Sequence, residues 1–115
     1  MTNYANGGTR TLDDVLTPYM DIDGVVAAAL VSTDGLLVAT TGDNSNLEAI
    51  AANSASAMSS AVSLAGELGS GRPRMMTLEL TGQTLVFAPM TSDLFLVLVG
   101  SRRLPAYTRD HRPSF

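Results

Sequence analysis

At 115 residues, the chain has room for one hydrophobic core but not for a second domain of ordinary size. Its composition, 45% hydrophobic and 16% charged, excludes an intrinsically disordered protein, and the absence of cysteine excludes disulfides and thiolate chemistry. Residues 1–101 hold three arginines and ten carboxylates, a net charge of −7, which disfavours nucleic acid as a partner.

Residues 1–10 are polar and show no apolar period, so we expect a flexible N-terminus. They offer no apolar stretch that could serve as the core of a secretory signal. The longest apolar runs, residues 25–31 and 94–99, are much shorter than a membrane span. These features predict a cytoplasmic protein.

A first helix is predicted to begin after Thr11, with Asp14 favouring its N-terminal end. Its apolar residues follow helical spacing: Leu12, Val15, Leu16, Tyr19 and Met20. Pro18 removes a helical hydrogen bond, so this helix should be short or kinked.

Two strands are predicted next. Residues 25–31 are apolar on both faces, as expected of an inner strand that is covered on two sides. Asp34 and Gly35 form a dipeptide that is typical of a hairpin turn, and residues 36–41 return as the second strand.

A long helix follows the glycine at position 42. Ser45 and Glu48 have the spacing of a capping box and predict its start, while Gly69 is suited to the position after its last residue, Leu68. At 1.5 Å per residue, this helix would be about 36 Å long, enough to cross a small sheet.

Three further strands are predicted over residues 75–80, 84–90 and 94–99, joined by short turns. In the first of them, Met76, Leu78 and Leu80 should form a buried face. The order α-β-β-α-β-β-β predicts an α+β fold: a five-stranded antiparallel sheet with one long and one short helix. The domain spans residues 11–101. Residues 102–115 are an arginine-rich tail that we expect to be flexible and not bound to a membrane.

The two faces of the long helix differ from those of an ordinary surface helix. One apolar stripe should face the sheet: Leu47, Ile50, Ala51, Ser54, Met58, Ala61, Ala65 and Leu68. The opposite face carries nothing larger than serine for about four turns, and only then Glu67. Its small residues are Ala49, Ala52, Ser56, Ser59, Ser60 and Ser63. Small side chains let two helix backbones approach to roughly 8 Å, so we expect this face to meet another helix, most simply that of a second copy. The alternative is a serine-rich surface without a partner.

Catalytic and metal-binding patterns give no support for an enzyme. His111 lies in the tail, away from any shaped pocket, and no base is placed to activate a serine. Gly66, Gly69 and Gly71 follow a helix and do not open one, so they cannot form a phosphate-binding loop. The cluster of Asp43, Asn44 and Asn46 is better explained by helix capping than by a metal, and the pair Asp21 and Asp23 lacks the remaining ligands of a calcium loop. We predict no catalytic residue, no metal and no cofactor.

The order of elements, the segment from Gly24 to Gly35 ending in Ser-Thr-Asp-Gly, and the small-residue helix resemble the roadblock/LC7 family. The resemblance covers about residues 11–101 and is nearest in character to the bacterial members that accompany small GTPases. It implies a profilin-like roadblock fold that forms a homodimer or pairs with a paralogue. In such a dimer the long helices pair and the edge strands join, here through Met75, Thr77 and Glu79.

The resemblance also implies a regulatory or adaptor partner of a small Ras-like GTPase, acting by protein–protein contact. Two other functions stay open from the sequence: a scaffold subunit that contacts no GTPase, and a small-molecule sensor domain. Many members carry a further C-terminal helix, whereas residues 102–115 contain two prolines and no apolar period. Functions of that helix are therefore not expected here.

Overall fold

The structure is a computed structural model that describes residues 12–42 and 46–101. In chain order these residues form two short helical segments, two strands, a long helix and three strands. The elements are α1 (Leu12–Leu16), the 3-10 helix η1 (Thr17–Asp21), β1 (Val25–Ser32), β2 (Leu37–Gly42), α2 (Leu47–Leu68), β3 (Met76–Glu79), β4 (Thr84–Pro89) and β5 (Leu94–Gly100). The predicted order and the α+β fold class are confirmed.

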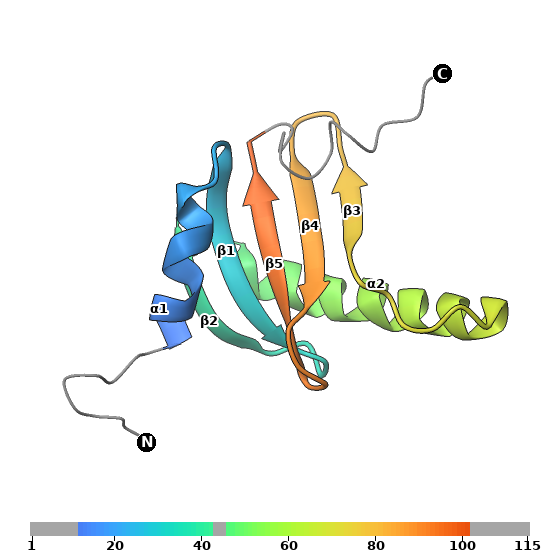
Figure 1. Cartoon of the computed structure of the whole chain (residues 1–115). Helices are drawn as coiled ribbons and strands as arrows, with labels where there is room; N and C mark the ends of the chain where they lie inside the picture. The colour runs from blue at the N-terminus through green and yellow to red at the C-terminus, as the bar shows by residue number, and fades with distance from the viewer. Residues whose placement is uncertain (1–11, 43–45, 102–115) are drawn as a thin grey trace.

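The five strands form one antiparallel sheet in the order β2-β1-β5-β4-β3. The first and the last strand of the sequence, β1 and β5, therefore lie side by side near the middle, while β2 and β3 are the two edges. Figure 1 shows α1 on one face of the sheet, over β1 and β2, and α2 crossing the other face.

The hydrophobic core has two layers, one on each face of the sheet. Because side chains of a strand alternate, β1 contributes to both. Ala27, Ala29 and Val31 pack in the layer beneath α2, and Ala28 and Leu30 pack in the layer beneath α1. All five side chains are buried. The prediction of an inner strand covered on both sides is confirmed.

The first helix is interrupted in the way that Pro18 predicts. The α-helix α1 ends at Leu16, and the chain continues as the tighter 3-10 helix η1, with the proline in its first turn. Leu16 is fully buried in the layer beneath α1, with Tyr19 and Met20 packed against it. The apolar stripe predicted for one helix is therefore divided between two short helical segments, α1 and η1.

The long helix starts one residue later than predicted. Asn46 is its N-cap, and the carbonyl of Asn46 accepts the bond from the N–H of Ile50 at 2.9 Å. Ser45, the predicted cap, lies outside the described residues. The C-terminal end agrees with the prediction: Gly69 has a left-handed φ of 64°, and the N–H of Ser70 donates to the carbonyl of Ala65 at 3.2 Å.

The predicted buried face of β3 is wrong. The strand is only four residues long, and although Met76 is half-buried, Leu78 and Leu80 are 46% and 51% exposed. The alternation itself is present, since Met76 pairs with Phe87 and packs against the layer beneath α2. However, β3 is an edge strand, and α2 packs mainly against β1 and β2, which lie toward the opposite edge of the sheet. In one copy of the chain, Leu78 therefore keeps about half of its side-chain surface open to solvent.

Candidate protein-interaction surface

The two halves of α2 have different surroundings. We call residues 47–58 the first half of the helix and residues 59–68 its second half. All buried residues lie in the first half: Leu47, Ala51, Ser54, Ala55 and Met58. From Ser59 to Leu68 no residue is buried. Figure 1 gives the reason, because α2 crosses behind the sheet and then runs on past the edge strand β3. The helix is longer than the sheet that it covers.

The apolar stripe of α2 does not stop where the sheet stops. Val62 and Ala65 follow Met58 at four and seven residues, so they point in the direction in which Met58 packs. Ala65 is half-buried and Val62 is 41% exposed. Leu64 and Leu68, on the flank of the stripe, are 62% and 68% exposed. The prediction that Leu68 faces the sheet is therefore wrong within one copy of the chain.

The small-residue face of α2 lies where the sequence places it. All six of its residues are exposed on the side of the helix away from the sheet: Ala49, Ala52, Ser56, Ser59, Ser60 and Ser63. The turn between β1 and β2 approaches one flank of this face, since a Cβ built on Gly35 would lie 3.5 Å from Cα of Ala52. One flank of the small-residue face therefore lies beside the β1–β2 turn, and the rest of the face is open to solvent.

Of the three interface residues predicted along this edge, Thr77 and Glu79 lie on β3, and Met75 precedes the strand. Thr77 pairs with Val86, which packs in the layer beneath α1, so Thr77 and Glu79 point to the face opposite α2. Met75, just before the strand, is 40% exposed. These residues and the second half of α2 both lie at the free edge of the sheet. On the α2 side that edge presents Leu78, which the sequence analysis had assigned to the core.

Charge on the described surface is unevenly distributed. Arg72 and Arg74 are the only basic residues of ranges 12–42 and 46–101, and both are exposed in the segment that joins α2 to β3. Among these residues there is no group of three or more potential metal ligands. The predicted capping cluster at Asp43 and Asn44, and the tail that carries His111, lie outside the described residues.

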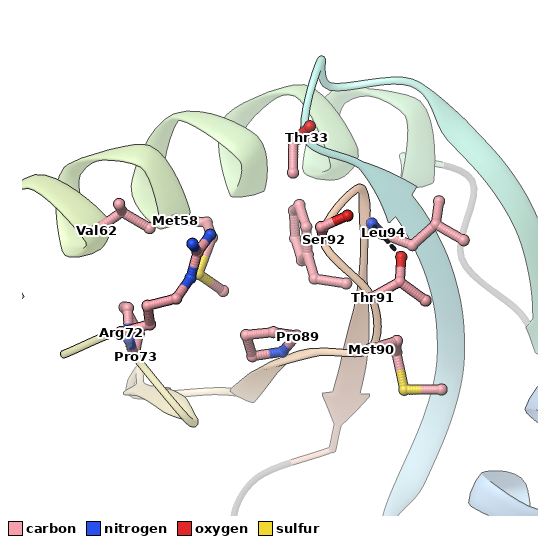
Figure 2. Close-up of a pocket in the computed structure, with 11 residues that line it drawn as sticks. Thr33, Met58, Val62, Arg72, Pro73, Pro89, Met90, Thr91, Ser92 and Leu94 are labelled. Carbon is pink, nitrogen blue, oxygen red and sulfur yellow. Dashed lines mark hydrogen bonds between the residues drawn. The ribbon is translucent and has the colours of Figure 1, made fainter.

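A groove opens between the middle of α2, the segment that follows α2, and the turn between β4 and β5. It has a volume of about 390 Å³. Figure 2 shows its lining side chains: Thr33, Met58, Val62, Arg72, Pro73, Pro89, Met90, Thr91, Ser92, Leu94 and Phe95. This groove could not be predicted from local sequence patterns, because it depends on where α2 leaves the sheet.

No helix within the described ranges is long and apolar enough to span a membrane.

Comparisons with known proteins identify the fold. The chain is similar to a Roadblock/LC7 domain from Streptomyces avermitilis, with 23% identity over 82% of this chain and 81% of that one and a TM-score of 0.74. It is also similar to MglB of Myxococcus xanthus, with 19% identity, coverage of 80% and 76%, and a TM-score of 0.72. An MglB with a tetrameric arrangement gives 23% identity, coverage of 76% and 68%, and a TM-score of 0.70.

Among curated proteins, the comparison found no significant match. The family model described as Roadblock/LC7 domain matches residues 11–100, nearly the whole of the domain predicted from the sequence. The chain therefore belongs to the Roadblock/LC7 domain family.

Proposed function

We propose that the protein is a dimeric regulatory partner of a small Ras-like GTPase, that it acts in the cytoplasm by protein–protein contact, and that it is not itself an enzyme. The observation that carries this proposal is the second half of α2, where the apolar stripe continues past the edge of the sheet and none of its residues is fully buried. Exposed apolar side chains that gather on one helix, here Val62, Leu64 and Leu68, are typical of an interaction site.

In the proposed dimer a two-fold axis lies beside the free edge of β3. The second half of α2 from each copy then covers the sheet of the other, and Leu78 of each copy moves from a free edge into the interface. Such an interface is self-complementary, as a two-fold dimer requires. Burying a Val or Leu side chain that is now about half exposed would contribute roughly 1 kcal/mol for each residue in each copy.

The small-residue face of α2 supports close packing of helices. With Ala and Ser at its surface, the helix can approach another helix to roughly 8 Å, at the close end of ordinary packing. In the proposal this face contacts the partner copy along one flank and offers the rest of the helical layer to the GTPase. That one MglB structure holds a tetrameric arrangement supports self-association in proteins of this fold.

Titration against a small GTPase tests the part of the proposal that concerns the GTPase. A purified small Ras-like GTPase would be loaded with GDP or with a GTP analogue, and its binding to this protein measured by calorimetry. We expect binding that differs between the two states, because a regulator must distinguish them. Equal and negligible binding in both states would contradict the proposal.

A pair of matched variants locates the contact. Ser56→Arg places a long charged side chain in the middle of the small-residue face, whereas Ser101→Arg places the same side chain at an exposed position at the end of β5. We expect only Ser56→Arg to weaken self-association or GTPase binding. The scaffold function gains support if the dimer is stable, binds no GTPase and copurifies with a defined larger assembly.

A further inference from the structure

The groove beside the β4–β5 turn has an apolar floor that is already formed. Met58 and Phe95 are 6% and 1% exposed, so they belong to the core and reach the groove only with their outer surface. Pro73 and Pro89 line it from two different segments. Proline has a fixed φ, so these walls lose little freedom when something binds against them.

The wall made by the β4–β5 turn is held by hydrogen bonds. Thr91 Oγ1 accepts bonds from the N–H groups of Asp93 and Leu94, both at 3.1 Å. The carbonyl of Asp93 accepts a bond from the N–H of Thr33 at 3.0 Å, which ties this turn to the β1–β2 turn. On this side, the groove is therefore bounded by two hairpin turns that are hydrogen-bonded to each other.

One cation lies at the groove. In Figure 2 the side chain of Arg72 extends from the segment after α2 toward Met58. Within ranges 12–42 and 46–101 no carboxylate pairs with this guanidinium, although the same ranges hold nine carboxylates and only two arginines. A carboxylate on a partner would therefore be repelled by most of the described surface and attracted here.

The shape of the groove decides between a small molecule and a protein segment. Ligand pockets enclose about 70–90% of a small molecule, but this groove is open to solvent along one side. A segment that is part of a larger partner covers the open side with its own surface. We propose that the groove binds a short partner segment in which an apolar side chain packs on Met58 and Phe95 and a neighbouring carboxylate pairs with Arg72.

This inference goes beyond the proposed GTPase contact and does not depend on it. It concerns the α2 surface beside the hairpin turns, whereas the GTPase contact concerns the small-residue face, probed by Ser56→Arg. Failure of one test leaves the other unaffected.

Methionine methyl groups report binding directly. Of the six methionines, Met58 and Met90 line the groove, while Met20 packs in the layer beneath α1. The full chain with 13C-labelled methionine methyls would be titrated with the peptide acetyl-Gly-Leu-Phe-Asp-Gly-amide and with its Asn counterpart. We expect the Asp peptide to shift the resonances of Met58 and Met90 and to leave that of Met20 in place.

Arg72→Gln and its matched control Arg74→Gln test the charge. Both arginines are exposed in the same segment, but only Arg72 lines the groove. We expect Arg72→Gln to weaken binding of the Asp peptide about threefold, as for an exposed ion pair, and Arg74→Gln to leave it unchanged. The proposal is overturned if both peptides bind equally, if no methyl shifts at millimolar peptide, or if the peptide dissociates the dimer, which would make the groove a contact between copies.

Discussion

The first and second halves of α2 have the same kind of sequence and opposite surroundings. Both carry a stripe of apolar residues at helical spacing with small residues on the other side. In the first half the stripe is buried against β1 and β2, and in the second half it lies beyond the edge of the sheet. The apolar period of a helix predicts the direction in which each side chain points. The width of the sheet decides whether that side chain has anything to pack against.

The largest contrast is expected from the same substitution in each half. Ala51 is 1% exposed beneath the first half of α2. Ala51→Asp would bury a carboxylate with no partner among apolar side chains, which we expect to cost about 3 kcal/mol or more of the free energy of unfolding. Urea denaturation followed by circular dichroism checks this. A variant that unfolds at the same urea concentration as the parent would show that the helix does not pack as described.

Ala65→Asp is the matched change in the second half, where Ala65 is half-buried at a stripe position. One copy of the chain can hydrate this carboxylate, so we expect the fold to survive. The proposed dimer cannot, and its dissociation constant should rise about 100-fold, or about 2.7 kcal/mol. Sedimentation velocity over a range of concentrations measures the effect. If Ala65→Asp unfolds the chain as Ala51→Asp does, the two halves are not different and the comparison fails.

Most of the fold could be predicted from local patterns, whereas the site could be predicted only in part. The hairpin at Asp34 and Gly35 and the end of α2 at Gly69 depend on a few neighbouring residues, and both agree with the structure. The exposure of Leu78 and Leu68 depends on the order of strands in the sheet, which puts β3 at an edge. Strand order is set by long-range pairing between β1 and β5, and no local pattern contains it.

A single methyl group should distinguish the close approach of β1 and β2 from the free end of the long helix. Gly42 is the last residue of β2 and has a φ of +100°, and a Cβ added there would clash with the carbonyl oxygen of Val26 and lie 2.6 Å from Cα of Ala27. Gly42→Ala therefore combines a strained backbone with a clash against backbone atoms that cannot move independently. We expect a loss of about 2 kcal/mol in the free energy of unfolding, measured by urea denaturation. An unchanged midpoint would contradict the close approach of the two strands.

The same methyl group at Gly66 should act in the opposite direction. Gly66 lies in the last turn of α2, and a Cβ built there meets no atom within 4 Å. Alanine is a better helix former than glycine by roughly 0.5–1 kcal/mol, because it restricts the unfolded chain more. We expect Gly66→Ala to stabilise the chain by about this amount in dilute solution, where the monomer predominates. If the variant is destabilised there, a side chain at position 66 meets other atoms of the same copy, which would contradict the open surroundings of the last turn of α2.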